Sequence, residues 1–471
     1  MNMINVRRLT VMTFLGAGML SGISAQVSPL QVDTLKETKI PDQWDLQSCI
    51  DYAKEQNITI RKSRITAVST QIDVKTAKAA LFPSLSFSTG HQVVNRPYQE
   101  TSSRVSGSEI ISSNSKTSYN GNYGLNASWT LYNGNKRLKT IQQEKLNNQM
   151  AELDVATSEN NIQESIAQVY IQILYAAESV KVNENTLQVS IAQRDRGQEL
   201  LNAGSIAKSD LAQLEAQVST DRYQLVTAQA TLEDYKLQLK QLLELDGENE
   251  MNIYLPTLSD ENVLAPLPTK RDVYISALSL RPEIEASKLN VEASELGINI
   301  AKSSYFPTIS LSAGIGTNHT SGSDFTFGEQ VKNGWNNSIG LSVSVPIFNN
   351  RQTKSAVQKA KLQYETSMLS LLDEQKALYK TIESLWLDAN SAQQRYAAAS
   401  EKLKSTQISY ELISEQFNLG MKNTVELLTE KNNLLQAQQE QLQAKYMAIL
   451  NTQLLKFYQG CLLYTSDAAD E

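Results

Sequence analysis

Four stretches of the chain alternate apolar residues with small or polar ones, which is the two-residue period of a β-strand. The clearest stretch runs from Ser338 to Asn350 as SIGLSVSVPIFNN, and a near copy runs from Tyr123 to Gly134 as YGLNASWTLYNG. Because successive side chains of a strand point to opposite faces, each stretch predicts a ribbon with one aliphatic face and one small, polar face. Each ribbon then opens a long polar helix, so the two copies indicate an internal repeat.

A Phe-Pro pair opens the first strand of each repeat, at Phe82-Pro83 and at Phe306-Pro307. Proline disfavours continuation of the helix before it, so we expect each preceding helix to end there. The alternation predicts strands over about 82–93, 122–132, 306–317 and 337–348. Gly90–Asn122 is rich in Ser, Asn, Gly and Thr, so we expect a long exposed loop there, with a glycine-containing loop in the second repeat.

Helical stretches of unusual length follow the second strand of each repeat. Lys136–Asn202 contains no Pro and a single Gly, and Arg351–Asn418 has a similar length. At 1.5 Å per residue, roughly 67 residues of helix span about 100 Å, far more than a helix of a globular domain. Turns at 203–208 (the first tip) and 418–424 (the second tip) end these helices, and return helices follow. We therefore expect two long helical hairpins.

Apolar residues recur every three or four positions along these helices. They include Ile162, Ile166, Val169 and Ile173 in the first repeat and Leu427, Leu428, Leu434 and Leu435 in the second. A narrow apolar stripe between polar flanks favours helices packed side by side in a wall with water on both surfaces. The alternative is a rod-like coiled coil without a lumen.

The two ends of the chain do not belong to this pattern. Arg7 and Arg8, an apolar run over 9–23 and Ser24-Ala25 predict a secretory signal peptide at 1–25, followed by an extended leader at 26–43. The last eleven residues, CLLYTSDAADE, back-translate into a sequencing-library adapter. We therefore interpret 461–471 as an artefact and expect the natural sequence to differ after about Gly460. Between the ends lie a first repeat at 44–250, a linker at 251–270 and a second repeat at 271–460.

The composition excludes several classes of function. The formal net charge is −7, and the chain remains acidic without its two ends, which argues against nucleic acid as a partner. Without the tail only Cys49 remains, and His91 and His319 stand alone among polar residues, so we expect no disulfide and no metal site. We find no catalytic constellation and expect neither an enzyme nor a cofactor.

The pattern of residues in the strands indicates a membrane protein. Their polar face is nearly free of charge, which fits a transmembrane β-barrel that is apolar towards lipid and polar towards a lumen, although a soluble sheet packed on a helix is the alternative. Aromatic residues at the helix-proximal strand ends favour the barrel. These are Phe82, Trp129, Tyr132, Tyr305, Phe306 and Phe348. We expect the following side chains to face lipid: Leu125, Trp129, Leu341 and Val343. Four strands cannot close around an open lumen, so several copies must share one barrel.

The chain resembles the TolC-type outer-membrane efflux proteins from about Trp44 to Gly460. The resemblance rests on the tandem repeat, the two Phe-Pro strand starts and the two tips, LLNAGSIAKSDL and QFNLGMKNTVELL. It implies an α+β membrane protein whose homotrimer forms a 12-stranded transmembrane β-barrel in the outer membrane, continued by a long periplasmic α-helical barrel. It also implies that solutes pass through this duct from a periplasmic adaptor and an inner-membrane pump. The alternative function is a rod-like periplasmic or surface adhesin or scaffold.

The resemblance further implies a periplasmic gate and a docking surface. In the family, an aromatic residue, a basic residue and two carboxylates on the second tip form the gate with a carboxylate on the first tip. The matching positions here are Asp210, Phe417, Lys422 and Glu426. Phe417 lacks a hydroxyl group, and Thr429 occupies the second carboxylate position, so Glu430 is the candidate replacement. The expected adaptor-docking residues are Gly204, Ser205, Leu211, Gly420, Met421 and Leu427.

Overall fold

The computed structural model describes residues 41–98, 102–106, 109–113, 116–246, 251–256, 263–321 and 325–461. The account below concerns the unit that begins at Asp42. The expected signal peptide at 1–25, most of the leader at 26–43 and the tail from 462 onwards lie outside the described residues.

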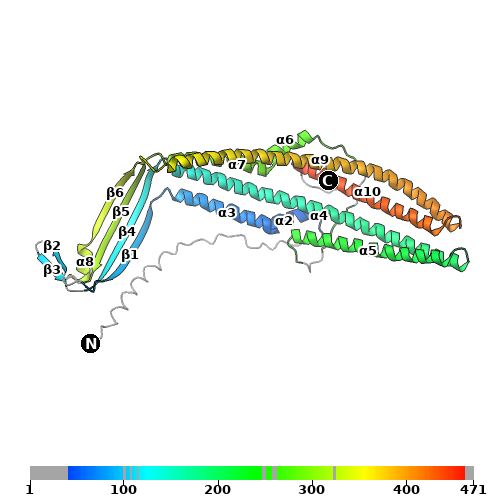
Figure 1. Ribbon diagram of the computed structural model, residues 1–471, viewed down its shortest axis with the longest axis horizontal. Helices are drawn as coiled ribbons and strands as arrows, with labels where there is room; N and C mark the ends of the chain where they lie inside the picture. The colour runs from blue at the N-terminus through cyan, green and yellow to red at the C-terminus, as the bar shows by residue number, and fades with distance from the viewer. Residues whose placement is uncertain are drawn as a thin grey trace, which may run out of the picture. The chain divides into compact units, whose positions relative to one another are not determined.

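The first half of the described chain contains two helices, two long strands with a small hairpin between them, and two long helices (Figure 1). In order these are α2 Leu46–Gln56, α3 Ile58–Ala79, β1 Ser84–Asn95, β2 Ser102–Ser106, β3 Glu109–Ser113, β4 Thr117–Asn133, α4 Lys136–Asn202 and α5 Lys208–Leu242. The second half follows the same order, with a short helix in place of the small hairpin. Its elements are α6 Lys270–Leu280, α7 Pro282–Ser303, β5 Thr308–Thr320, α8 Phe327–Asn333, β6 Asn336–Ser344, α9 Gln352–Asn418 and α10 Thr424–Tyr458.

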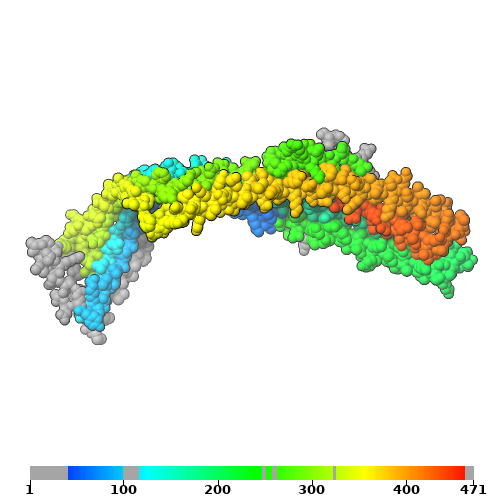
Figure 2. Space-filling model, turned by 45° about the horizontal axis from the view of Figure 1, so that its top comes forward, coloured from blue at the N-terminus to red at the C-terminus, as the bar shows by residue number. Residues whose placement is uncertain are grey.

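Corresponding helices of the two halves have equal lengths. The long helices α4 and α9 each contain 67 residues, and the return helices α5 and α10 each contain 35. The pair α2 and α6 each contain 11 residues, and α3 and α7 each contain 22. Both tips lie at the end of the long helices that is away from the sheet (Figures 1 and 2). The repeat therefore extends to the lengths of these four pairs of helices.

Each long helix leaves the sheet through two consecutive residues in the left-handed conformation. The angle φ is +67° at Gly134 and +63° at Asn135 before α4, and +49° at Asn350 and +66° at Arg351 before α9. Glycine and asparagine adopt this region most readily. A Cβ on Gly134 would also lie 2.6 Å from the carbonyl oxygen of Ser303. The residues that end each ribbon therefore build the sharp turn between strand and helix.

The strands β1, β4, β5 and β6 form one antiparallel sheet in that order, so the two repeats join at the β4–β5 pair. The register aligns the residues in rows across the strands. One row is Leu85, Ala127, Ala313 and Ile339, and the neighbouring row is Ser84, Ser128, Ser312 and Gly340. Because directly paired residues point to the same face, the sheet has one aliphatic face and one face of small polar residues. This is the arrangement that the alternation predicts.

The aliphatic face of the sheet is exposed in the single chain. Leu341 is 65% exposed and Val343 is 58% exposed, and Leu125 and Trp129 are also exposed. The four side chains share one face, because Trp129 and Leu341 both pair with Leu311 and the others follow at even spacing. A soluble sheet packed on a helix would bury this face, so that alternative does not account for it. An extended apolar surface of this kind marks a contact with lipid or with another protein.

The strands of the first repeat extend further than the sequence predicted. β1 continues to Asn95 and β4 begins at Thr117, so the loop expected over 90–122 was wrong at both ends. The added residues pair across the two strands, as Val93 does with Tyr119. Composition indicated a loop because these residues are polar, whereas the pairing satisfies their backbone groups in a strand.

The second repeat departs from the prediction in two places. The expected loop contains α8, which begins with a capping box between Thr326 and Glu329. The last strand, β6, ends at Ser344 rather than near 348. Pro346 explains the earlier end, because proline has no N–H group to donate to a strand neighbour.

In the part of the chain that the structure describes, three clusters of buried apolar side chains hold the helices together. The largest surrounds Trp44 and Tyr170 and joins α2 and α4 to the end of α5 and to the second half of α10. Of the two smaller clusters, one joins α6, α7, α9 and α10, and the other joins Val263 to α9 and α10. Among the described residues, none of the three clusters includes a buried α10 side chain nearer to the tip than Leu442. Between Leu442 and the tip, Leu427, Leu435 and Ala437 of α10 are also buried, outside these three clusters.

A buried arginine also links the two halves. The Arg281 guanidinium, at the start of α7, lies 2.6 Å from a carboxylate oxygen of Glu164 on α4 and 3.6 Å from the ring centre of Tyr458 on α10. Burial, and then the negative charge of Glu164, raise the pKa of the Tyr458 hydroxyl to about 12. Arg281 therefore fixes three helices from both repeats at one point.

The described helices are polar for their length. A helix needs about 20 predominantly apolar residues to cross a bilayer. In the part of the chain that the structure describes, no helix offers a stretch of that length and hydropathy.

Candidate functional site at the helical tips

The two tips are turns of the same kind. At the first tip the Gly204 N–H donates to the Leu201 carbonyl at 2.9 Å, and at the second tip the Gly420 N–H donates to the Phe417 carbonyl at 2.9 Å. The following residue in each turn donates to a carbonyl five residues back, which completes the glycine-dependent ending of a helix. Both glycines have φ of +75°, and a Cβ on either would meet no atom within 4 Å. The left-handed backbone, rather than crowding, is therefore what requires glycine here.

The second tip presents apolar side chains to the surroundings. Leu419 is 72% exposed and Met421 is 70% exposed, and Val425 in the first turn of α10 is also exposed. The first tip offers Gly204 and Ser205, which are exposed but small. The second tip is therefore the more apolar of the two surfaces.

Two residues expected at the docking surface are buried instead. Leu427 has no exposed area, and Leu211 packs near Gly197 of α4, where the two helices of the first hairpin approach closely. These leucines belong to the apolar stripe of their helices, which sequence position near a tip does not reveal. The exposed members of the expected set are therefore Gly204, Ser205, Gly420 and Met421.

Lys422 and Glu426 form an ion pair at the start of α10. The Lys422 Nζ donates to the Glu426 Oε1 at 2.6 Å, while the Glu426 Oε2 accepts from the Asn423 N–H at 3.2 Å. The Asn423 side chain caps the helix in return by accepting from the Glu426 N–H at 2.9 Å. The hydrogen bond from Lys422, and then that from the Asn423 backbone, hold the pKa of the Glu426 carboxyl below its usual value.

The other expected gate residues make separate local contacts. Asp210 accepts from the Ala207 N–H at 3.0 Å in the first turn of α5, and Glu430 accepts from the Ser409 hydroxyl at 3.2 Å across to α9. Thr429 donates to the Val425 carbonyl of its own helix, and Phe417 is buried. Within the described part of a single chain, these side chains are not brought together at one point.

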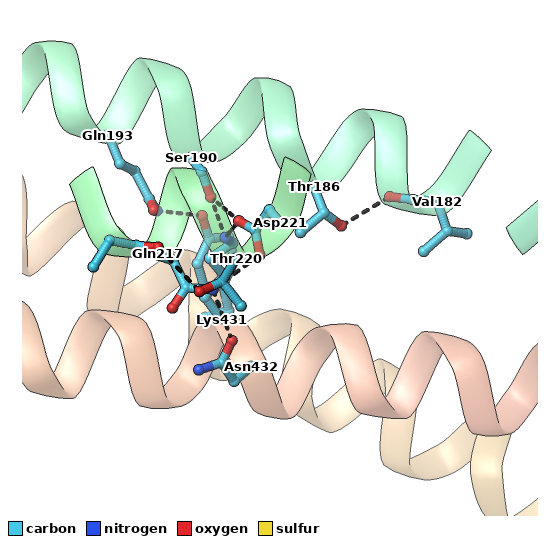
Figure 3. Close-up of polar contacts among 11 residues, drawn as sticks. Val182, Thr186, Ser190, Gln193, Gln217, Thr220, Asp221, Lys431 and Asn432 are labelled. Carbon is cyan, nitrogen blue, oxygen red and sulfur yellow. Dashed lines mark hydrogen bonds and ion pairs between the residues drawn. The ribbon is translucent and has the colours of Figure 1, made fainter. Parts of the chain in front are cut away.

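A buried ion pair that sequence analysis missed links the two hairpins. Lys431 of α10 donates to a carboxylate oxygen of Asp221 on α5 and to the hydroxyl oxygen of Ser190 on α4 (Figure 3). The Ser190 hydroxyl in turn donates to the same oxygen of Asp221. All three side chains are at most 3% exposed. One side chain of the second hairpin is thus held by two side chains of the first.

Two amide side chains extend this contact. The Gln217 Nε2 donates to the free oxygen of Asp221 at 2.9 Å and to the Asn432 Oδ1 at 3.4 Å (Figure 3). The Gln193 Nε2 donates to the Tyr410 hydroxyl of α9 at 2.8 Å. Burial lowers the pKa of the Lys431 ammonium, and the hydrogen bond and charge of Asp221 oppose that shift. The two hairpins are therefore joined near their tips by polar contacts.

The missed residues do leave a signal in the sequence. Lys431 stands four residues after Leu427 and four before Leu435, which places a charge within the apolar stripe of α10. Asp221 likewise follows Leu214 and Val218 at helical spacing. A charge within such a stripe must find a partner when the helix packs, because an unpaired buried charge is costly.

The sequence matches one family of known proteins over most of its length. Residues 49–244 and 273–460 match the family model described as outer membrane efflux protein. The outer membrane protein TolC of Escherichia coli (strain K12) is 23% identical over 430 residues, which covers 89% of this chain and 82% of TolC. The outer membrane efflux protein BepC of Brucella suis biovar 1 is 24% identical over 294 residues, or 62% of this chain and 61% of BepC.

Solved structures of outer-membrane channels share the fold. A crystal structure of CusC, from a study of its folding and transmembrane channel formation, superposes with a TM-score of 0.74 at 19% identity and covers 88% of this chain and 91% of CusC. The outer membrane protein VceC of Vibrio cholerae gives a TM-score of 0.72 at 16% identity, with 89% and 97% of the two chains covered. At these identities the likeness shows a common fold.

The lowered pKa of Glu426 predicts a pH dependence of the second tip. Because the folded-state pKa lies below the usual value of 4.5, the ionised carboxylate stabilises the first turn of α10 fully above pH 4.5, and this stabilisation is lost as the pH falls through the lower value. Amide hydrogen exchange of the peptide that contains Val425 and Leu427, corrected for intrinsic exchange, should show the loss of protection. Glu426→Gln is the matched control, because it keeps the shape and cannot titrate. The same pH profile in both proteins would contradict the prediction.

Proposed function

Because this chain belongs to the outer membrane efflux protein family, we propose that it forms a duct that passes solutes from a periplasmic adaptor and an inner-membrane pump to the outside. The chain is an outer-membrane protein whose helices extend into the periplasm. The observation that carries the proposal is the four-stranded sheet, which has one exposed aliphatic face and one face of small polar residues. Such a sheet suits a wall between lipid and water.

The barrel is a homotrimer of 12 strands. In the described part of the chain, β1 and β6 stand at the edges of the long sheet and pair on one side only. Unpaired edge groups need partners within a bilayer, and four strands cannot enclose an aqueous lumen. Pairing β1 of one copy with β6 of the next satisfies both edges, and three copies close the ring.

The aliphatic face of this barrel lies against lipid. Leu125, Trp129, Leu341 and Val343 are the exposed side chains that meet the hydrocarbon region. The Ser and Gly rows on the other face line the lumen, where small side chains leave room for solutes. Aromatic side chains such as Phe82, at the helix-proximal end, mark the interface of the membrane.

The helical hairpins of three copies form the periplasmic barrel, and their tips meet the adaptor. The docking surface consists of Gly204 and Ser205 on the first tip and Gly420 and Met421 on the second, with the apolar side chain of Leu419 beside them. Apolar side chains at the centre of a contact contribute most of its binding energy. The adaptor in turn couples the duct to the inner-membrane pump.

The gate of the duct lies at the same end. Asp210, Phe417, Lys422, Glu426 and Glu430 are the residues that we assign to it. Copies of Glu426 from three chains form a ring of carboxylates, which attracts cations. Each Lys422 offsets the charge of its own Glu426 and so reduces repulsion within the ring.

A rod-like adhesin or scaffold is the second candidate function. It accounts for the two long helical hairpins, but it gives no role to the exposed aliphatic face of the sheet. A barrel should show heat-modifiable migration in gel electrophoresis of the membrane fraction, and a rod should not.

The experiment that tests the proposed function is reconstitution. The purified protein should crosslink to a trimer in detergent and should give stepwise single-channel currents in planar bilayers. Glu426→Ala should reduce the cation preference of these currents, because it removes the carboxylate ring. Monomers and dimers alone, or bilayers without currents, would overturn the proposal, and an unchanged cation preference would remove Glu426 from the gate.

Neighbouring positions of β6 test which face meets lipid. A lysine in place of Val343 near the bilayer midplane should cost roughly 2–4 kcal/mol, because its charge would enter hydrocarbon. Ser342→Lys is the matched control on the opposite face and should cost far less. The measurement is the yield of heat-modifiable trimer in the membrane. A loss of trimer in Ser342→Lys but not in Val343→Lys would show that the faces are reversed.

The second tip can be tested for docking through its turn. Gly420→Val forces a β-branched residue into the left-handed region at a cost of about 1–2 kcal/mol and should displace Leu419 and Met421. Export should fall severalfold while insertion of the barrel, measured by heat modifiability, stays unchanged. Gly328→Val is the control, since that glycine lies on α8 and a Cβ there also meets no atom within 4 Å. Normal export in Gly420→Val would exclude the turn as a docking surface.

A further inference from the structure

The charges of the chain are distributed unevenly where the helices meet the sheet. The whole chain holds 43 Lys and Arg residues against 50 Asp and Glu residues. The helices α3, α4, α7 and α9 meet the sheet at the same end (Figure 1). Four stretches of sequence form this junction, and together they contain ten Lys or Arg residues and no Asp or Glu: 74–83, 128–143, 297–308 and 345–364. An acidic protein therefore has a band without acidic residues at this level.

Each of the four helices contributes an exposed lysine to this band. These are Lys78 of α3, Lys136 of α4, Lys302 of α7 and Lys354 of α9, which we call the basic collar. Each stands within the three helical residues nearest the sheet. Among the residues that the structure describes, no carboxylate forms an ion pair with any of the four. The collar is therefore a set of exposed positive charges without a counter-charge in the described chain.

Helix stability accounts for only half of the collar. Cations are favourable near the C-terminus of a helix, which is where Lys78 and Lys302 stand. Lys136 and Lys354 stand in the first turns of α4 and α9, where a cation opposes the helix dipole and neither helix has an acidic residue. Both long helices thus begin with a positive dipole end and an exposed lysine, an arrangement that favours a bound anion.

A neighbouring copy does not supply the counter-charge at this level. In the proposed trimer the copies stand side by side at equal height, so each presents the same four stretches to its neighbours. Along each helix the first carboxylate stands five or more residues further from the sheet than the collar lysine, at Asp73, Glu144, Glu295 and Glu365. In that arrangement the balancing charge comes from outside the protein.

The collar lies at the level of lipid headgroups in the proposed barrel. Exposed aromatic side chains mark the helix-proximal end of the sheet, and they are Phe82, Tyr305, Phe306 and Phe348. In a transmembrane barrel such a girdle lies at the membrane interface. Lysine side chains have long apolar stems that lie along apolar surface while the ammonium group stays in the polar headgroup region. Phosphate groups of phospholipids are the anions that are abundant at this level.

We propose that the basic collar binds the anionic headgroups of phospholipids in the periplasm-facing leaflet, so that the protein selects anionic over zwitterionic lipid around its barrel. The inference rests on the proposed function, which places the sheet in a bilayer, and adds a lipid specificity to it. Basic side chains held at a membrane surface attract anionic lipid and act within about one Debye length of it. The collar residues are separate from those that we assign to the gate and to the docking surface.

The test measures which lipids surround the reconstituted full chain. Phosphatidylglycerol and phosphatidylcholine carry the same nitroxide at the same acyl-chain position and are added in trace amounts to phosphatidylcholine bilayers that contain the protein. Electron spin resonance separates lipid held at the protein from free lipid, and the ratio of the two held fractions gives the preference. The wild type should prefer phosphatidylglycerol roughly twofold or more. In about 1 M salt the preference should approach unity, because the Debye length falls to about 3 Å.

The collar variant replaces all four lysines, as Lys78→Gln, Lys136→Gln, Lys302→Gln and Lys354→Gln. Its preference should fall by roughly half or more, because each of the four helix ends loses a cation. If this variant does not insert, Lys136→Gln with Lys354→Gln decides the question. That pair should lower the preference in the same direction, and it also removes the two cations that oppose a helix dipole.

The matched control makes the same substitution at four exposed lysines far from the sheet, as Lys181→Gln, Lys208→Gln, Lys376→Gln and Lys404→Gln. It changes the net charge equally and should keep the wild-type preference. The cations at the opposite end of the sheet stay in both variants, and they include Arg96, Lys116 and Lys332. A preference that arises at that end would therefore survive in the collar variant.

Equal retention of the two lipids by the wild type would overturn the collar. A preference that the collar variant keeps, or that the matched control also loses, would overturn it too, because the selection would then arise elsewhere or from net charge alone. Failure of the proposed function has a different signature. A protein that does not enter the bilayer would hold neither lipid, whereas failure of the collar alone would leave both lipids held in equal amounts.

Discussion

The two edge strands of the described sheet have unpaired backbone groups, and the need to pair these groups constrains the rest of the molecule. Within the described part of one chain, β1 and β6 pair on one side only, and hydrocarbon offers no hydrogen-bond partner to the other side. In the proposed trimer, neighbouring copies supply those partners and close the sheet into a ring. In that proposed ring each copy sends its long helices in one direction, where they pack against those of the neighbouring copies.

The turns between the sheet and the long helices set the direction of those helices, and so the position of the tips at the periplasmic end. Consecutive left-handed residues, Gly134-Asn135 and Asn350-Arg351, redirect the chain at corresponding points of the two repeats. Because α4 and α9 then have equal lengths, their tips finish together. A change in length of one long helix would offset one tip from the other and would also shift the register of the Lys431 ion pair, so both repeats must keep the same length.

Local patterns in the sequence were sufficient for most of the fold but for less of the site. The alternation predicted the two faces of the sheet, and α4 was predicted with the bounds that the structure gives it. The far ends of β1 and β4 were missed because their polar residues look like a loop until the partner strand is known. The Lys431 ion pair was missed for a related reason: its three side chains come from three helices, and no local period connects them. The tip glycines, by contrast, depend only on their own backbone and could be recognised directly.

The position of the ion pair along α10 has a mechanical consequence. If the apolar packing that begins at Leu442 is the fulcrum, Lys431 lies about 16 Å from it and the tip at Thr424 about 27 Å from it, at 1.5 Å per residue. The helix then acts as a lever in which the ion pair lies between the pivot and the tip. A force applied at the tip reaches the ion pair multiplied by about 1.6, the ratio of the two arms. By the same ratio, a small separation at the ion pair becomes a larger displacement at the tip.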